Sequence, residues 1–367
     1  MKTIIVNGAN GYVASNFISN LLTKKYRVIA LVRANKKQAP EKRMADVLKD
    51  INDNLPVDTS NLEVYNYSLL EENFAIEEKD LKQIFNGTVD YFHFAASLKF
   101  DEKSVDEIFL ANVKGLENSI EVFSKFASGN SRFFYIGTAY SCGRFNGVFK
   151  EKFYKNKDIS AFRNYYEQSK RVAENIVKRH VRENKLNGHV IRLSQVVGNH
   201  KTGITKTDYG IFDFAKRIYN LASRYPDETI RVHVDPDSTQ NLIPVDTVTE
   251  HLTKITETGT VPEILNFVSK NSIRNSHIIE VLNNLVPMRI LPVKELDRKE
   301  MNPIERMISA GMSFSENYTS TSISFDSRQR DKLLECPGTV PDDYSVAKML
   351  EYFIETLSEK KKKSEAA

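Results

Sequence analysis

The sequence predicts an α/β fold in which a doubly wound parallel sheet carries helices on both faces. Short apolar runs alternate along the chain with segments whose apolar residues recur at helical spacing. A glycine-rich turn joins the first predicted strand to the first predicted helix, and no long flexible linker interrupts the alternation. Strands that alternate with helices form parallel sheets, because each return to the same edge of the sheet requires a crossover connection.

The composition is that of an ordinary globular protein. Its 367 residues suffice for one large domain or two smaller ones, and 41% of them are hydrophobic. The formal charge of +4 is inflated by the run Lys360–Lys363, so nucleic-acid binding has little support. Cys142 and Cys336 lie far apart and the 7 histidines show no metal-ligand spacing, so we expect no disulfide framework and no metal. The chain is predicted to be cytoplasmic, without a signal peptide or membrane span.

The first element is the strand Ile4–Val6, which leads into the glycine turn. Gly8, Gly11 and Ala14 have the spacing Gly-x-x-Gly-x-x-Ala, and residues 15–22 continue as a helix. Glycines let the backbone approach a pyrophosphate, and a helix N-terminus offers N–H groups and partial positive charge. A tight turn without a ligand is the alternative, but a turn that opens a βαβ unit favours a Rossmann-type dinucleotide site. The predicted contacts are Gly8, Asn10, Gly11, Tyr12, Val13 and Ala14.

The residues after the second strand, Arg27–Val32, predict which dinucleotide binds. Sites that prefer NAD usually have an acidic residue here, which hydrogen-bonds the ribose hydroxyls. In this chain Arg33 follows the strand, and Arg43 lies in the next predicted helix. A guanidinium pairs with a 2′-phosphate through charge-assisted hydrogen bonds. NADP(H) is therefore the predicted cofactor, and a solvated basic loop is the alternative.

The next elements continue the alternation of helices and strands. We predict helices over 42–51, 79–85 and 104–126 and strands over 62–67, 89–96 and 131–136. Ala95 and Ala96 suit a backbone that passes close to a cofactor, although they suit plain close packing equally. Asn112 lies in the middle of a helix, where asparagine is a weak helix former. His93 is interpreted as a core histidine rather than a catalytic one.

The candidate catalytic residues follow the strand over 131–136. Thr138 lies at its end, and a helix predicted over 159–183 contains Tyr166 and Lys170. These two side chains are four positions apart and project from one face of the helix. Tyr166 can donate a proton to a carbonyl oxygen while Lys170 lowers its pKa, and Thr138 can donate a second hydrogen bond to the oxyanion.

Two similar patterns are interpreted as structural. Tyr344 and Lys348 repeat the Tyr-x-x-x-Lys spacing, but they follow the predicted sheet and no threonine-bearing strand precedes them. Tyr165 has Ser169 where a lysine would be required.

The remaining elements predict a second region. Strands are predicted over 189–193, 241–245 and 263–268, and helices over 211–223, 247–255 and 345–357. Residues 1–199 would form the cofactor-binding domain, with later sheet strands from about 241–270. Residues 200–240 and 271–357 would form a smaller, mostly helical substrate-binding region. Residues 358–367 would form a charged, disordered tail.

Several short segments, taken together, have the pattern of one enzyme family. They are Val32-Arg33 with Arg43, His93–Phe100, Asn112–Gly115, Thr138–Tyr140, Tyr166–Lys170, Arg192–Gly198, Lys201–Gly203, Phe325–Ser327 and Cys336-Pro337. In these segments the chain resembles the extended short-chain dehydrogenases/reductases. It is most similar to the thioester-reductase and fatty acyl-CoA reductase branch, over nearly the whole chain.

The resemblance implies catalytic roles for Thr138, Tyr166 and Lys170. The cofactor residues that we add to the glycine turn on this basis are Arg33, Arg43, Ala95, Ala96, Ser97, Asn112, Tyr166, Lys170, Leu193, Ser194 and Val196. The chain departs from the family where Asn7 and Asn10 replace threonine, Gly137 replaces serine and Leu193 replaces proline. None of these departures removes a catalytic group.

The resemblance further implies an NADPH-dependent reductase that converts an acyl thioester to an aldehyde, with reduction to an alcohol left open. The acyl group would arrive on CoA or on a separate carrier protein. Met307–Tyr318 is a candidate lining of the acyl pocket, although core packing is the simpler explanation. The alternative is an NADPH-dependent ketone or aldehyde reductase, or another tailoring enzyme of secondary metabolism, because the same residues serve any carbonyl. A non-catalytic NADP-binding regulator is a third interpretation, which the three catalytic residues disfavour.

Overall fold

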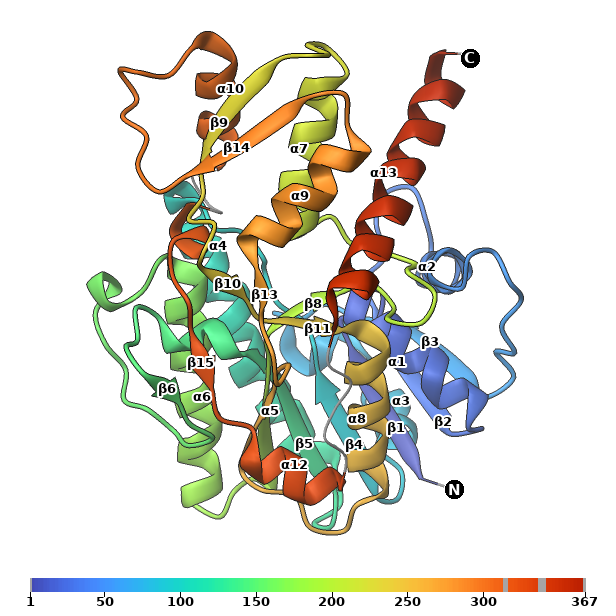
Figure 1. The fold of residues 1–367 in the computed structure, drawn as a ribbon. Helices are drawn as coiled ribbons and strands as arrows, with labels where there is room; N and C mark the ends of the chain where they lie inside the picture. The colour runs from blue at the N-terminus through green and yellow to red at the C-terminus, as the bar shows by residue number, and fades with distance from the viewer. Residues whose placement is uncertain (1, 313–315, 336–340, 366–367) are drawn as a thin grey trace. The chain divides into compact units, whose positions relative to one another are not determined.

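The computed structural model describes the backbone of residues 2–312, 316–335 and 341–365 (Figure 1). The chain divides into two compact units. Unit 1 comprises residues 1–194, 248–267 and 325–337, and unit 2 comprises residues 195–247, 268–324 and 338–367. The first division follows Ser194, close to the boundary predicted at residue 199, and the assignment of the two regions to cofactor binding and substrate binding stays a prediction.

Unit 1 is built on a 7-stranded parallel sheet with the order β12-β7-β5-β4-β1-β2-β3. Its strands are β1 (Thr3–Asn7), β2 (Arg27–Val32), β3 (Leu62–Asn66), β4 (Val89–His93), β5 (Arg132–Thr138), β7 (Gly188–Leu193) and β12 (Ile264–Phe267). Most of these strands are continuous apolar runs because helices bury both faces of the sheet. The strand order reverses between β1 and β4, where parallel sheets of this kind bind ligands at the strands' carboxyl ends. The predicted Rossmann-type fold is confirmed.

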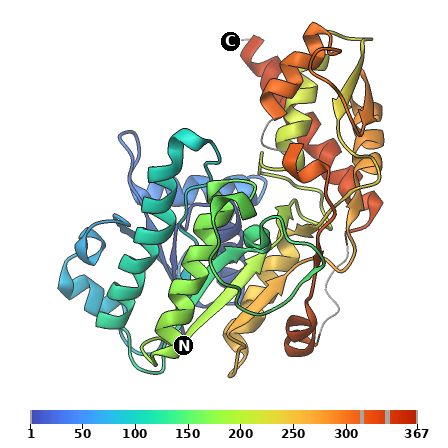
Figure 2. The same ribbon diagram turned by 90° about the vertical axis from the view of Figure 1, so that its left-hand side faces the viewer.

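One face of the sheet is covered by three helices. They are α3 (Glu78–Ile84), α5 (Gly115–Phe126) and α6 (Tyr165–Arg182). Leu116 and Val177 on these helices join Tyr91 and Phe133 on the strands in one buried apolar cluster. Figure 2 shows α5 in teal and α6 in green, side by side.

The opposite face is covered by α1 (Tyr12–Thr23), α2 (Pro40–Ile51) and α8 (Val245–Glu257). Phe17 of α1 packs against Phe92 of β4 with the ring centroids 4.8 Å apart. His251 of α8 packs against Phe267 of β12 at 5.2 Å. The short elements α4 (Val105–Phe109), β6 (Val148–Phe149), β15 (Ser324–Phe325) and α12 (Arg328–Leu334) complete this part of the chain.

Two predicted helices of unit 1 have different bounds in the structure. The helix predicted over 104–126 is interrupted by a π-helical turn, Leu110–Lys114, which separates α4 from α5. The turn contains the buried Asn112, whose amide binds backbone outside the helix. The helix predicted over 159–183 begins only at Tyr165, because the Asn164 side chain accepts a hydrogen bond from the Glu167 N–H at 3.0 Å and caps it there.

Unit 2 contains more helix than strand. Its helices are α7 (Ile211–Ala222), α9 (Asn275–Leu285), α10 (Pro303–Met312), α11 (Glu316–Thr319) and α13 (Asp343–Glu365). Its strands are two to five residues long and form three pairs in the described part of the chain. They are β8 (Gln195–Val197) with β11 (Leu242–Pro244), β9 (Thr229–His233) with β14 (Arg289–Val293), and β10 (Thr239–Gln240) with β13 (Ile273–Arg274). Phe212, Ile279 and Phe353 belong to the apolar cluster that joins α7, α9 and α13. No helix in the described ranges is long and apolar enough to cross a membrane.

Several expectations for this part of the chain were wrong. Residues 241–245 do not join the main sheet, because β11 pairs with β8; an apolar run predicts a strand, but packing decides its partner. The pair of β9 and β14 was not predicted. The tail predicted to be disordered from Ser358 continues α13 to Glu365, since glutamate and lysine are good helix formers. Part of the candidate lining segment Met307–Tyr318, and Cys336-Pro337, lie outside the described residues.

Candidate active site

The glycine turn after β1 passes directly against the backbone that follows β4. Gly8 has a φ of 61°, and a Cβ there would lie 2.8 Å from the backbone nitrogen of Ala95, so a side chain does not fit. The Gly11 N–H donates to the Gly8 carbonyl at 2.9 Å, and the Gly8 N–H donates to the Tyr67 hydroxyl at 3.1 Å. α1 then begins at Tyr12 with no side-chain cap and no acidic residue in its first turn. These features fit the pyrophosphate of a dinucleotide.

Asn7 ties this turn to the end of β4 through both ends of its amide. Its oxygen accepts hydrogen bonds from the N–H groups of Phe94 at 2.8 Å and Ala95 at 3.0 Å. Its nitrogen lies 2.9 Å from Nδ1 of the buried His93. Burial, with a smaller effect from Lys170, lowers the pKa of His93 to about 3, so this histidine is neutral. These contacts support a structural role for His93.

Arg33 and Arg43 come together beyond the end of β2. The Arg43 guanidinium donates to the Arg33 backbone carbonyl, and the Arg33 side chain is exposed. The Ala34 N–H donates to Asn66 Oδ1 at 2.9 Å, which holds the loop to the end of β3. The two cations predicted to bind the 2′-phosphate therefore lie in one anchored segment.

Asn112 connects the loop after β4 to α6. Its Oδ1 accepts from the Ser97 N–H at 2.7 Å, and its Nδ2 donates to the Ser97 carbonyl at 3.2 Å and to Ser169 Oγ at 3.0 Å. Ser169 Oγ in turn donates to the Tyr166 carbonyl at 2.8 Å. The π-helical turn contains Asn112, and such turns are frequent at functional sites. Asn112 therefore links the predicted cofactor loop to the predicted catalytic helix.

Lys170 lies buried beside Tyr166, as their spacing on α6 predicts. Its Nζ is 5.8 Å from the centroid of the Tyr166 ring and 5.1 Å from that of Tyr135, and it donates to the Ile136 carbonyl at 3.3 Å. Burial lowers the pKa of Lys170 to about 8, while the Glu174 carboxylate acts to raise it. An ammonium beside a phenol favours the phenolate, so this pair would suit proton donation by the tyrosine, a role that stays a prediction.

Thr138 ends β5 with its hydroxyl already hydrogen-bonded. It donates to the Leu193 carbonyl at 3.2 Å and accepts from the Tyr140 N–H at 3.2 Å. A hydrogen bond to a substrate oxyanion would replace the bond to Leu193. Gly137 stands where the family usually has serine. A Cβ at this position would lie 3.2 Å from the Tyr135 ring and 3.6 Å from Glu174 Oε1, so glycine leaves no side chain between these two groups.

The last two predicted cofactor residues belong to different units. Ser194 ends unit 1, and its N–H donates to the Phe267 carbonyl at 3.0 Å. Its hydroxyl is buried without a hydrogen-bond partner in the described part of the chain, which suits a polar group of a ligand. Val196 lies in β8 of unit 2. The cofactor and catalytic assignments, including those of Asn10, Val13, Ala14 and Ala96, remain predictions.

Sequence reasoning missed two residues beside Tyr166 and Lys170. Phe100 packs edge-to-face on the Tyr166 ring, and Glu174 acts on the charge of Lys170. Phe100 ends the segment His93–Phe100 that carries the family resemblance, and Glu174 lies one helical turn after Lys170. Both features are visible in the sequence, but neither shows which groups the side chains of Phe100 and Glu174 contact.

Comparison with known proteins identifies the family. Residues 6–252 match the family described as male sterility protein. The chain is 27% identical over 180 residues to peramine synthetase A of Epichloe festucae (strain Fl1), which covers 48% of this chain and 6% of that protein. It is 28% identical over 152 residues to fatty acyl-CoA reductase 1 of Homo sapiens, which covers 39% of this chain and 29% of that protein. The matched part is thus less than a third of each of these relatives.

Solved structures share the fold at low sequence identity. The terminal R domain from the myxalamid PKS-NRPS biosynthetic pathway has a TM-score of 0.76 at 17% identity, covering 97% of this chain and 91% of that one. A thiolation-reductase di-domain from an archaeal non-ribosomal peptide synthetase has a TM-score of 0.73 at 17% identity, covering 97% and 76%. UDP-glucuronic acid 4-epimerase from Bacillus cereus, in complex with NAD, has a TM-score of 0.66 at 16% identity, covering 97% and 98%. Since the family match covers well over half of its residues, the chain belongs to the male sterility protein family, and its resemblance to the reductase branch is confirmed.

Proposed function

We propose that this protein is an NADPH-dependent reductase that converts an acyl thioester to an aldehyde. The observation that carries the proposal is the buried Lys170 ammonium beside the Tyr166 ring, on the helix that Asn112 ties to the loop after β4. Relatives named as a peramine synthetase, a fatty acyl-CoA reductase and an R domain support a reductase of thioesters over other carbonyl chemistry.

The residues of the chain supply proton donation and orientation. NADPH, when bound at the glycine turn, supplies hydride for the carbonyl carbon. Tyr166 donates its proton to the carbonyl oxygen as negative charge develops there, and Lys170 makes the phenol a stronger acid. Thr138 donates a second hydrogen bond to the same oxygen. The product is a hemithioacetal, which expels the thiol and leaves the aldehyde.

The finer parts of the proposal have separate support. Arg33 and Arg43 favour NADP(H) over NAD(H), because a 2′-phosphate needs cationic partners. Fatty acyl-CoA reductase 1 supports an acyl group carried on CoA, and the thiolation-reductase di-domain supports one carried on a separate carrier protein. A second reduction, from aldehyde to alcohol, is left open, and a role in secondary metabolism and a cytoplasmic location complete the proposal.

The test is incubation of the purified protein with NADPH and an acyl-CoA or acyl-carrier thioester. We expect NADPH oxidation with release of one thiol for each aldehyde formed. Turnover of free ketones or aldehydes without any thiol release from thioesters would favour the alternative carbonyl reductase. Full biological activity of Tyr166→Phe would favour the non-catalytic regulator.

A further inference from the structure

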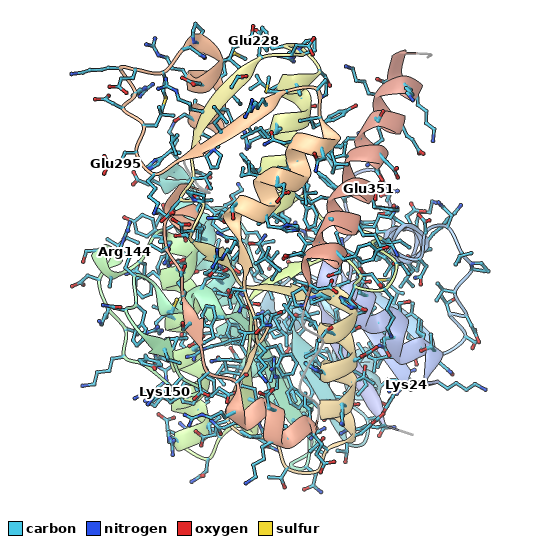
Figure 3. All side chains as sticks on the ribbon, viewed as in Figure 1. Lys24, Arg144, Lys150, Glu228, Glu295 and Glu351 are labelled. Atoms are coloured by element: carbon cyan, nitrogen blue, oxygen red, sulfur yellow. The ribbon has the colours of Figure 1, made fainter. Side chains whose placement is uncertain are left out.

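A cluster of buried charges surrounds the Lys170 end of α6. It consists of Lys170, Arg171, Glu174 and Arg192, whose exposed fractions are 3%, 3%, 0% and 0%. By contrast, the cations labelled in Figure 3, such as Lys24, project from the surface. Burial of a charge is costly unless a partner compensates it, so three buried cations around one carboxylate require an explanation.

Arg192 occupies both oxygens of the Glu174 carboxylate. Its Nε donates to Oε1 at 2.9 Å and its Nη2 donates to Oε2 at 2.7 Å. Ser141 Oγ also donates to Oε1, at 2.7 Å. The carboxylate is therefore held in one orientation by β7 and by the turn after β5. Lys170 lies one helical turn before Glu174 on the same face of α6. It therefore experiences the part of the Glu174 negative charge that Arg192 does not neutralise.

Three other titratable groups lie around Lys170, and burial keeps two of them, Tyr135 and His93, uncharged. Tyr166 shares its helix, Tyr135 lies on β5 and His93 lies on β4. Burial raises the pKa of Tyr135 well above its usual value, and burial lowers the pKa of His93 to about 3. In the described part of the chain, Glu174 is therefore the acidic group that opposes the loss of the Lys170 charge.

We propose that Glu174 and Arg192 are positioning residues that together set the charge of Lys170. Glu174 holds the ammonium protonated beside Tyr166, and Arg192 limits this effect by sharing the carboxylate. The inference rests on the proposed function, in which the Lys170 charge acidifies Tyr166. It requires opposite consequences for the two variants. Without the Glu174 charge, burial of Lys170 is no longer opposed by a carboxylate, and without the Arg192 charge Lys170 lies near a carboxylate that no arginine shares.

The direct test is the pKa of Lys170 in the cofactor-free protein. It can be measured by NMR on protein labelled with 13Cε-lysine, with the signal assigned by Lys170→Ala. We expect Glu174→Gln to lower this pKa and Arg192→Gln to raise it, each by roughly one unit, the size of a charge interaction within a protein. Glu174→Asp should restore most of the original value. Glu183→Gln, which removes an exposed carboxylate at the C-terminal end of α6, is the matched control and should change nothing.

The second readout is the pH profile of kcat/KM with NADPH and a thioester. The alkaline limit should move to lower pH in Glu174→Gln and to higher pH in Arg192→Gln. Each single variant breaks a buried pair, so the double variant Glu174→Gln/Arg192→Gln keeps the test available if either fails to fold. In this double variant we expect a pKa of Lys170 below the wild-type value, because the nearer, negative group has been removed.

Two outcomes separate the inference from the proposed function. An unchanged Lys170 pKa in folded variants, or shifts in the same direction for Glu174→Gln and Arg192→Gln, would overturn the inference. A wild-type protein that turns over no thioester would overturn the proposed function, and the NMR titration would still report on the charge pair.

Discussion

The ring of Phe100 packs edge-to-face against the ring of Tyr166, with their centroids 5.2 Å apart and their planes at 77°. Phe100 follows Ser97 in the loop after β4, and the hydrogen bonds between Asn112 and Ser97 anchor the middle of this loop. An ion pair of 2.6 Å between Lys99 and Glu107 holds the same loop. The proposed acid is therefore oriented by a side chain from the loop that follows β4.

We expect Phe100→Ala to lower kcat/KM about twofold to tenfold, because an aromatic pair contributes about 0.5–1.5 kcal/mol. NADPH affinity should stay at the wild-type value. Phe126→Ala is the control, since it removes an aromatic contact with Phe85 elsewhere in the unit and should lower stability without changing kcat/KM. Wild-type kinetics in Phe100→Ala would show that Tyr166 is oriented without this ring.

Tyr166→Phe removes the proposed acid while keeping the ring. We expect kcat to fall by about 10²–10⁴, the usual contribution of a positioned proton donor. NADPH binding, followed by fluorescence, should persist. Tyr165→Phe removes a hydroxyl from the neighbouring residue and should leave kcat near the wild-type value. Equal losses of kcat in the two variants would show that the Tyr166 hydroxyl is not the specific proton donor.

Arg33→Ala and Arg43→Ala test the choice of cofactor. A hydrogen bond to a charged group contributes about 1.5–3 kcal/mol, and exposure to solvent reduces this figure, so we expect each change to weaken NADPH binding about tenfold. NADH binding should not change, because NADH has no 2′-phosphate. Lys49→Ala, an exposed cation in the last turn of α2, is the control. Calorimetric titration with both cofactors would contradict the NADP preference if their affinities fell together.

Gly8→Ala should abolish dinucleotide binding. The new Cβ would lie 2.8 Å from the Ala95 nitrogen at a φ of 61°. Gly87→Ala is a matched control, because Gly87 also has a positive φ, 79°, but nothing lies within 4 Å of its Cβ position. Both variants carry backbone strain and should melt at lower temperature, whereas NADPH affinity should fall only in Gly8→Ala. Retention of wild-type affinity in Gly8→Ala would remove the glycine turn from the site.

Lys170→Met should stabilise the cofactor-free protein at neutral pH while abolishing activity. The folded-state pKa of Lys170, about 8, lies below the usual 10.5, so the folded protein binds this proton more weakly than the unfolded chain does. The resulting destabilisation of the folded protein is fully present below the folded-state pKa of Lys170. It fades as the pH rises toward the pKa of this lysine in the unfolded chain. We expect a gain of a few kcal/mol, since each pKa unit corresponds to about 1.4 kcal/mol. Urea unfolding at about pH 7 and about pH 10 should show the gain shrinking; a pH-independent difference would contradict it.

The sequence by itself determined the elements of the sheet and the local parts of the site. β1, β2 and β5 each contain a short apolar run, and such runs predict buried strands from local pattern alone. Gly8 and Gly11 lie in one turn, and Tyr166 and Lys170 share a helical face at any packing of the helix. Sequence spacing sets these relationships, because each is completed within a few residues.

Only the tertiary structure decided which distant groups meet. Asn7 binds His93 because β1 and β4 are neighbours, and Asn112 reaches Ser169 because a π-helical turn interrupts its helix. The pairing of β11 with β8, and not with the main sheet, was decided in the same way. The charge of Lys170 depends on its burial and on a carboxylate that Arg192 shares. Strand order and helix packing create these contacts, and no spacing along the chain encodes them.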